Sequence, residues 1–331
     1  MENLLENLNK EQIKAVKCTE GPVIVFAGAG TGKTKTLTSR IAYMIAEKNI
    51  NPRNILAITF TKKATNEMRE RTIKMVGDDA RYVTISTIHA LCARILRQTI
   101  EVLGYSKNFE IVDEDDANKI INDIYKELDL SRKYFSPRAA YNIISSYKNG
   151  IGEINGIPKQ IYDLYQARLK KNDQVDFDDL LLLTEEVFST HPEILEHFQR
   201  KYQYILVDEF QDTNPLQVEI FFYLAAQEIN EDYSKCVPLP GSLFIVGDPK
   251  QSIYRFSGAD VTVFSSTKEL FEQNDNSEVL YMTQNFRSNN VVKKWFNASM
   301  KVVLDYDFDK TPFVDIPTED DKNNNLFHGA Y

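Results

Sequence analysis

The chain has 331 residues, of which 43% are hydrophobic and 26% are charged, and its formal net charge is −9. This composition is ordinary for a globular protein, and the length is sufficient for two domains. The negative charge excludes attraction of nucleic acid or anionic membrane to the surface as a whole, so a polyanion would have to bind in a local groove.

The N-terminal stretch MENLLENLNKEQ has neither the basic nor the apolar region of a signal peptide, and no apolar run approaches the roughly 20 residues of a membrane helix. We therefore expect a cytoplasmic protein that does not enter a membrane. The cysteines Cys18, Cys92 and Cys236 are far apart and lack C-x-x-C spacing. This favours reduced packing thiols over a disulfide framework or a zinc site.

Short apolar, β-branched runs alternate with helical patterns along most of the chain, which predicts an α/β fold with a parallel sheet and helices on both faces. Between about Tyr105 and Arg200 the pattern changes to consecutive helical stretches, which predicts a helical insertion. The acidic residues between Asp173 and Glu186 are expected to form a solvated face. The expected strands are Val23–Ala27, Ile55–Phe60, Tyr82–Ser86, Tyr204–Val207 and Leu243–Val246, and the expected helices of the insertion are Ala117–Leu128, Pro137–Lys148, Gln160–Lys170 and Phe177–Val187.

The first expected strand leads into the sequence AGAGTGKT, which has the spacing of a P-loop with alanine in the first glycine position. Glycines let the backbone wrap so that successive N–H groups point at phosphate, with the positive end of the next helix behind them. In this pattern Lys33 neutralises β and γ oxygens, and Thr34 ligates magnesium. A Rossmann site does not fit, because Lys33 stands where the third glycine belongs. The predicted nucleotide-binding residues of the loop are Gly28, Ala29, Gly30, Thr31, Gly32, Lys33 and Thr34.

The expected strand Tyr204–Val207 ends in two adjacent carboxylates, Asp208 and Glu209. In a chain with a P-loop, the first carboxylate of such a pair is expected in the shell of the metal, and the second orients and deprotonates the attacking water. The pair therefore predicts hydrolysis of a nucleoside triphosphate as well as its binding. The long separation of Lys33 from Asp208 accommodates the helical insertion.

Several further motifs follow one another in order along the chain, and together with the P-loop and the carboxylate pair they read LNKEQIKAV, AGAGTGKT, ILAITFTKKATNEMRER, ISTIHALCARILR, DFDDLL, ILVDEFQDTNPLQ, VGDPKQSIYRFSGAD and YMTQNFRSNN. With these motifs the chain resembles the superfamily 1A DNA helicases of the UvrD/Rep/PcrA type, with features of their RecB/AddA relatives. The resemblance runs from Leu8 to about Val292 and implies a RecA-like P-loop NTPase domain, an inserted all-helical subdomain, and ATP with Mg²⁺ as ligands. The implied divisions are 1–104 and 201–280 for the ATP-binding domain, 105–200 for the insertion, and 281–331 for the incomplete start of a second RecA-like domain.

The resemblance also implies roles for residues outside the P-loop. Gln12 is similar to the glutamine that reads adenine, with Arg40 and the Phe286 ring beside the base, where the family usually has tyrosine at the latter position. Gln251 resembles the sensor of the γ-phosphate that links nucleotide to DNA. Arg287 resembles one of two arginines that stabilise charge on the transferring phosphoryl group, and the second is expected in a later motif that this chain lacks.

Aromatic side chains beside basic and hydroxyl groups predict a groove that stacks bases and holds the strand without reading its sequence. Phe60 stands at the end of an expected strand, and Tyr254, Arg255 and Phe256 stand together in an expected loop. A lone ring would be assigned to the core, but the place of these rings in motifs of the family favours contacts to single-stranded DNA. Further candidates for contacts to the DNA backbone are Thr59, Lys62, Thr87 and His89.

These features predict an ATP-dependent translocase or helicase that acts on single-stranded DNA and its junctions with duplex, in the 3′ to 5′ direction by resemblance. The sequence does not identify partner subunits, such as a nuclease or a repair protein. Two alternatives stay open: a nucleotide-gated DNA-binding or interaction module without productive turnover, and a small-molecule P-loop phosphotransferase. DNA-stimulated ATP hydrolysis distinguishes the first interpretation from both others. The isolated chain is expected to be weakly active or inactive.

Overall fold

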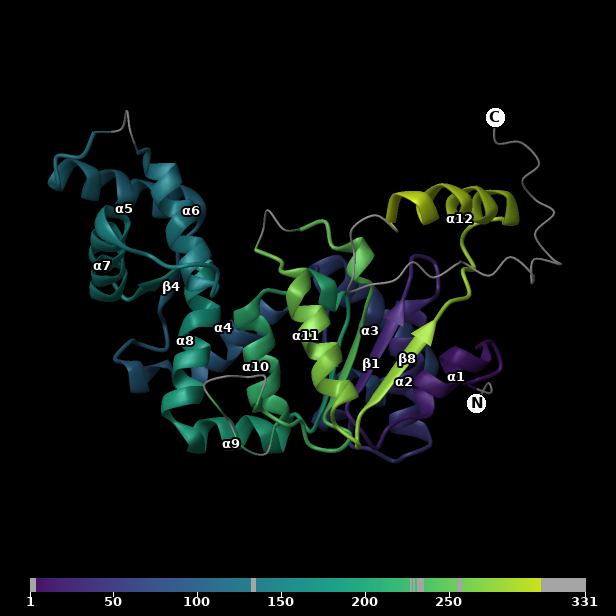
Figure 1. Cartoon of the computed structure of the whole chain (residues 1–331). Helices are drawn as coiled ribbons and strands as arrows, with labels where there is room; N and C mark the ends of the chain where they lie inside the picture. The colour runs from purple at the N-terminus through teal and green to yellow at the C-terminus, as the bar shows by residue number, and fades with distance from the viewer. Residues whose placement is uncertain are drawn as a thin grey trace.

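The computed structural model describes residues 4–131, 135–226, 228, 230, 235–254 and 258–304. For residues 301–304 it describes the backbone alone. Its centre is a six-stranded sheet in the order β3-β2-β6-β7-β1-β8, in which every pairing is parallel. Figure 1 shows this sheet among helices, with a separate helical lobe at one end. The strands are β1 (Val23–Ala27), β2 (Ile55–Ile58), β3 (Thr84–Ser86), β6 (Tyr204–Val207), β7 (Leu243–Gly247) and β8 (Glu278–Met282).

The predicted parallel α/β fold is confirmed, and two predicted strands, β1 and β6, have the expected bounds. The strand expected over Ile55–Phe60 ends earlier, because the chain turns at Thr61, whose side chain caps the following helix. β8 was not predicted. It pairs with β1 along its whole length but lies at the sheet edge, where Tyr281 is exposed and the apolar run of an interior strand is missing.

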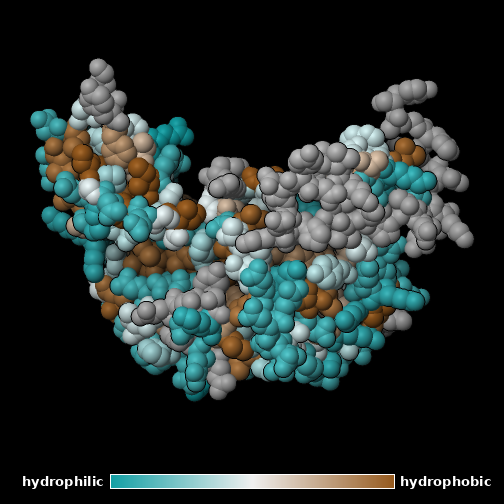
Figure 2. Space-filling model, in the orientation of Figure 1, coloured by the Kyte–Doolittle hydropathy of each residue, from teal (hydrophilic) through white to brown (hydrophobic). Residues whose placement is uncertain are grey.

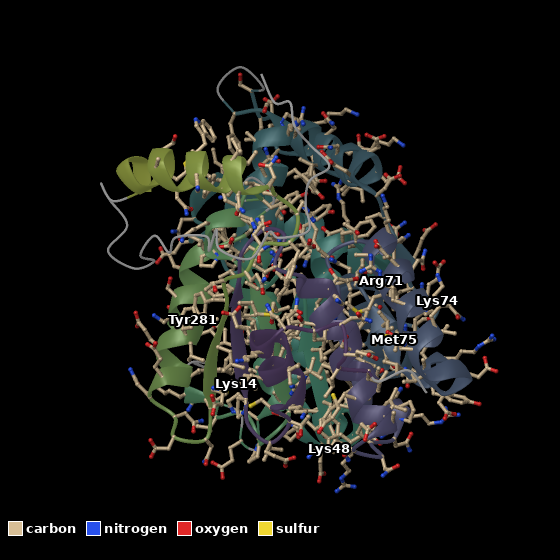
Figure 3. The ribbon with its side chains drawn as sticks, turned by 90° about the vertical axis from the view of Figure 1, so that its right-hand side faces the viewer. Lys14, Lys48, Arg71, Lys74, Met75 and Tyr281 are labelled. Carbon is tan, nitrogen blue, oxygen red and sulfur yellow. The ribbon has the colours of Figure 1, made fainter. Side chains whose placement is uncertain are left out.

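Alternate residues of the strands face two helical layers, as the period of two in a strand requires. One layer holds α1 (Lys10–Lys17), α2 (Lys33–Ala46) and α3 (Lys62–Val76). The other holds α4 (Ile88–Thr99), α8 (Phe177–Thr190), α9 (Pro192–Lys201), α10 (Pro215–Ala225) and α11 (Val261–Glu272). The side view in Figure 3 places Arg71 and Lys74 of α3 at one side and Tyr281 of β8 at the other.

The helical lobe has its own core, formed by α5 (Glu114–Glu127), α6 (Pro137–Lys148) and α7 (Gly156–Lys171). α8 and α9, which were predicted inside the insertion, pack instead with α4 and α10 against the sheet. The insertion is not all-helical, which corrects the prediction. A parallel pair, β4 (Glu110–Ile111) and β5 (Gln174–Val175), flanks the three lobe helices in the sequence. Each strand is too short to produce a period in the sequence.

α12 (Asn290–Leu304) follows β8 and lies across the end of the molecule from which the P-loop projects (Figure 1). Short 3₁₀ helices connect the larger elements at Pro52–Asn54, Gly77–Tyr82, Ile100–Leu103, Phe210–Asp212 and Pro249–Gln251. Within the described part of the chain, none of the helices combines the length and the apolar character needed to span a bilayer.

Candidate nucleotide and DNA sites

The candidate nucleotide site forms where three neighbouring strands end. β1 leads into the P-loop, β6 ends before Asp208, and β7 ends before Asp248. Because β6, β7 and β1 are adjacent and parallel, their carboxyl ends meet at one edge of the sheet. Open α/β sheets bind ligands at this edge.

The P-loop backbone requires glycine at two positions. Gly30 and Gly32 have φ angles of +76° and +87°, in the left-handed region that side chains rarely occupy. A Cβ atom on Gly32 would also lie 2.7 Å from Gln12 Nε2, and one on Gly30 would lie 2.8 Å from Arg287 Cβ. The loop is therefore closely packed by residues far away in the sequence, and Gly32 begins α2, whose N-terminus points at the site.

The predicted Lys33 and Gln251 lie together. The Lys33 ammonium donates to the Ala27 carbonyl at 3.0 Å and to Gln251 Oε1 at 3.2 Å. Gln251 Nε2 in turn donates to Asp248 Oδ2 at 2.6 Å, a contact that the sequence did not predict. Burial lowers the pKa of Lys33, while the charge of Asp248 opposes this effect. An incoming phosphate offers the ammonium stronger, charged acceptors than the carbonyl and amide oxygens that it contacts here.

Asp208 and Glu209 are held in two different environments. Burial, with the nearby Glu209 charge, raises the pKa of Asp208 to about 7, although the Glu209 N–H, Lys33 and the Thr34 hydroxyl favour its ionised form. Glu209 has a φ of +52°, which is unusual for a residue with a side chain. Backbone strain of this kind is found at functional sites.

Mg²⁺ fits the side chains of this site. A hydroxyl and a buried carboxylate, those of Thr34 and Asp208, lie side by side, and the carboxylate has too few donors to offset its burial. Magnesium prefers a few oxygen ligands of this kind, completed by water and phosphate. When bound, the ion supplies positive charge to the phosphate oxygens and to Asp208.

The segment after β8 packs directly on the P-loop. The Thr283 N–H donates to Glu11 Oε2 at 2.8 Å, and the Phe286 N–H donates to the Gly30 carbonyl at 2.9 Å. Asn285, which the sequence analysis missed, donates to the Ala29 carbonyl at 2.8 Å. Its Oδ1 accepts from the Arg287 N–H at 2.8 Å, so one buried amide positions the backbone of the predicted arginine beside the loop.

The predicted base-contacting residues divide into two groups. The Phe286 ring is 50% exposed beside the loop, and Gln12 Nε2 donates to the Thr31 carbonyl at 2.9 Å. Both positions are compatible with the predicted base site. Arg40 does not reach it, which corrects that prediction.

The Arg40 guanidinium is buried inside the fold. Arg40 Nη1 donates to the carbonyls of Ala15 and Cys18 at 2.8 and 2.7 Å, and its guanidinium carbon lies 4.2 Å from the centre of the Phe244 ring. It therefore ties the end of α1 to the sheet. Lys35, one turn earlier in α2, is the exposed cation on this helix near Gln12.

The candidate DNA groove contains two pairs of rings. The centres of Phe60 and Tyr254 are 4.8 Å apart, and those of His89 and Phe177 are 6.3 Å apart. Phe177 is 54% exposed at the start of α8, and the sequence analysis assigned it no role. Its sequence signals were its place in the motif DFDDLL and its position as a large apolar residue between two aspartates at a helix start. Arg255 and Phe256 lie outside the described residues.

The predicted backbone contacts differ in exposure. Lys62 is exposed at the first position of α3, and the Thr87 hydroxyl caps α4. Burial lowers the pKa of His89, which favours its neutral form. The Thr59 side chain is buried, and its hydroxyl lies 2.7 Å from that of Thr65. Thr59 also lines a cavity together with Phe60 and His89, so its contact with the DNA backbone stays a prediction.

A cavity of about 120 Å³ lies between the two candidate sites. Phe60 and His89 line it from the groove, and Asp208 and Glu209 line it from the nucleotide site. Apolar side chains of Ile88 and other residues complete its wall. Figure 2 shows the molecular surface hollowed between the helical lobe and the body that carries the sheet.

Comparisons with known proteins agree with this arrangement. Residues 8–272 match the model of the UvrD/REP helicase N-terminal domain. The chain is 40% identical over 315 residues to the ATP-dependent DNA helicase PcrA of Staphylococcus aureus, covering 92% of this chain and 40% of that protein. It is 43% identical over 309 residues to the same-named helicase of Bacillus subtilis, covering 90% and 40%. The chain thus spans about 40% of the length of these relatives, and it belongs to the UvrD/REP helicase family through its N-terminal domain.

Proposed function

We propose that this chain is the ATP- and DNA-binding part of an ATP-dependent translocase or helicase on single-stranded DNA. The observation that carries the proposal is the shared cavity, because Glu209 of the nucleotide site and Phe60 of the candidate groove line the same space. The residues proposed for hydrolysis and for DNA binding would therefore share the wall of one cavity. The relatives named above are ATP-dependent DNA helicases, which supports the same assignment.

In this proposal the side chains of the nucleotide site bind phosphate, hold Mg²⁺ and activate water. Lys33 and the N-terminus of α2 bind the phosphates, and Thr34 with Asp208 holds the metal. Glu209 accepts the proton of the attacking water. Gln251 and Arg287 approach the terminal phosphate from β7 and from the segment after β8, where charge grows as the phosphoryl group leaves.

Single-stranded DNA is the proposed polymer because stacked rings bind bases of any identity. Phe60, Tyr254 and Phe177 present exposed or half-buried rings on the candidate groove, and Lys62 supplies charge for phosphate. Movement in the 3′ to 5′ direction and action at duplex junctions belong to the proposal through the family resemblance.

Single-turnover hydrolysis of ATP, measured with and without a single-stranded oligonucleotide, tests the proposal. We expect binding of both ligands and slow hydrolysis that requires Glu209 and rises with DNA. Binding without any hydrolysis would favour a nucleotide-gated DNA-binding module. Phosphoryl transfer to a small-molecule acceptor, with no DNA binding, would favour a P-loop phosphotransferase.

A further inference from the structure

The junction between the helical lobe and the sheet-bearing body is built from two helix ends. α6 ends at Lys148, and the following Asn149 and Gly150 lie against the start of α10. A Cβ atom on Gly150 would lie 3.6 Å from Pro215 Cβ, so the backbones approach closely here. Asn149 and Asn214 are both buried at this contact.

A buried ion pair anchors the α6 side of the junction. The Lys148 ammonium lies 2.7 Å from Asp176 Oδ2 and 2.8 Å from Asp179 Oδ1, and these three side chains are almost fully buried. Tyr165 donates to the same Asp176 oxygen at 2.9 Å. This corrects the expected solvated acidic face, because two of its aspartates are interior residues. Their charges hold the N-terminus of α8, the helix that begins with Phe177.

Beside this anchor, hydrogen bonds connect three elements through one amide. Asn149 Nδ2 donates to Asp178 Oδ1 at 2.7 Å, and also to the Ser145 carbonyl at 2.9 Å. Asn149 Oδ1 accepts from Asn214 Nδ2 at 2.7 Å. Asn214 Oδ1 then accepts the Gln217 N–H at 2.8 Å and so caps α10. We call Asp178, Asn149 and Asn214 the amide relay.

The two ends of the amide relay adjoin the two candidate sites. Asp178 follows Phe177, whose exposed ring faces His89 in the candidate groove. Asn214 follows Thr213, which lines the cavity shared with Glu209. The connection between groove and hydrolytic turn thus runs through side chains that are buried or half-buried.

We propose that Asn149 is a positioning residue that couples strand binding at Phe177 to nucleotide binding at the turn after Glu209. This inference rests on the proposed function, since it needs both ligands. A DNA strand that displaces Phe177 also displaces Asp178 and the start of α8. The relay passes this displacement to Asn214 and the turn before α10. Reciprocal coupling of the two affinities is the consequence.

The relay has a polarity that makes it testable. Its central amide offers donors at one end and an acceptor at the other, and these match the Asp178 carboxylate and the Asn214 amide. Asn214→Asp keeps a good helix cap, because Asp and Asn are about equally favourable there. It replaces the donor that faces Asn149 by a carboxylate oxygen, so carboxylates flank the amide on both sides and one contact must be lost.

The experiment measures the affinity of the 331-residue chain for a fluorescent, non-hydrolysable Mg²⁺–ATP analogue, with and without saturating oligo(dT). We expect DNA to change the wild-type affinity about 5-fold or more, a common size for coupling between sites. In Asn214→Asp the affinity for nucleotide alone and the affinity for DNA alone stay within about 2-fold of wild type. DNA then changes the nucleotide affinity of this variant by less than about 2-fold. Thermal unfolding checks that each variant is folded.

A reversed relay and a distant cap provide the controls. In Asp178→Asn/Asn214→Asp the donor and acceptor ends are exchanged, so a flipped Asn149 amide can bond to both neighbours again, and coupling returns at least in part. Asn51→Asp changes a helix cap that accepts from the nearby Arg53 N–H, and coupling stays at the wild-type value.

The outcomes separate the relay from the proposed function. Two results would overturn the relay and leave the proposed function standing. The first is coupling of wild-type size in a folded Asn214→Asp variant. The second is a wild-type chain that binds both ligands without coupling between them. A double variant as uncoupled as Asn214→Asp would show that the cap, not the polarity, matters, and would also overturn it. A wild-type chain that fails to bind nucleotide or DNA would overturn both.

Discussion

The Lys33 ammonium donates a hydrogen bond to the Gln251 side-chain oxygen at 3.2 Å, although 218 positions separate the two residues in the sequence. The contact joins the loop after β1 to the loop after β7 at the edge where nucleotide is proposed to bind. Gln251 in turn precedes Tyr254 of the candidate DNA groove. Substitution can remove each of these three side chains separately.

Lys33→Ala and Glu209→Gln are expected to separate binding from hydrolysis. Lys33→Ala removes the cation beside the phosphates and weakens nucleotide binding. Glu209→Gln keeps the shape of the side chain but cannot accept a proton, so binding stays and turnover falls about 100-fold or more. Nucleotide titration and single-turnover hydrolysis measure the two effects. Near-normal hydrolysis in Glu209→Gln would remove this residue from the mechanism.

Tyr254→Ala is expected to weaken binding of single-stranded DNA by about 1 to 3 kcal/mol, the value of one stacked base. The dependence of affinity on salt should change little, because stacking releases no counterions. Lys62→Ala should reduce that dependence instead. Titrations of labelled oligonucleotide over a range of salt concentrations measure both. Tyr82→Ala removes an exposed ring that stacks on Arg53 and serves as the matched control.

The sequence predicted those parts of the molecule that local patterns determine. The P-loop and the carboxylate pair were found because each combines a strand, a fixed spacing and a change of chain direction within a few residues. The partner Asn285 was missed, because its contact with Ala29 arises from strands that become neighbours only in the folded sheet. Tertiary contacts of this kind leave no periodic signal in the sequence.

Charged residues caused the clearest errors. Arg40 was placed beside the base by the family resemblance, and Asp176 was placed on a solvated face because charge is costly to bury. Both are interior residues: two carbonyl oxygens accept from Arg40 Nη1 and a ring lies against its guanidinium, and an ammonium pairs with Asp176. Each partner lies in a different element, so neither exception could be read from the local pattern.

Arg40→Met is expected to destabilise the fold without a specific effect on nucleotide. The substitution leaves the carbonyls of Ala15 and Cys18 without their buried donor, which costs about 1 to 3 kcal/mol for a lost partner. Urea unfolding measures the change. Lys35→Met, on the exposed side of the same helix, should alter stability by less than about 0.5 kcal/mol. A stable Arg40→Met variant with weakened nucleotide binding would restore Arg40 to the base site.

Glu185 is expected to make stability fall as pH rises toward 8. Burial between α8 and α10, with the nearby charges of Glu219 and Glu186, raises the pKa of Glu185 to about 7. The folded state therefore keeps this proton at pH values where the unfolded chain has released it. The resulting stability is complete below about pH 4.5 and is lost as pH rises through about 7.

The change that isolates this effect is Glu185→Gln, followed by denaturant titration between pH 5 and 8. The variant should gain stability relative to wild type as pH rises, because it has no carboxylate to ionise. Glu193→Gln, at an exposed position of α9 whose charge does not act on Glu185, is the control and should run parallel to wild type. Parallel curves for Glu185→Gln and wild type would show that Glu185 ionises freely in the folded state.

The 331-residue chain is expected to bind nucleotide weakly and to unwind no duplex. A motor of this family closes two RecA-like domains around ATP, and arginines from the far side complete the stabilisation of charge. The described residues contain one RecA-like sheet and the single candidate arginine Arg287, held beside the P-loop through Asn285. An arginine of this kind can contribute about 1,000-fold or more to turnover, so the lack of a second one should outweigh the P-loop activity that remains. A strand-displacement assay coupled to ATP hydrolysis tests this, with a full-length relative as the positive control. Robust unwinding by the chain alone would show that its residues after β8 complete a motor, and would overturn this prediction.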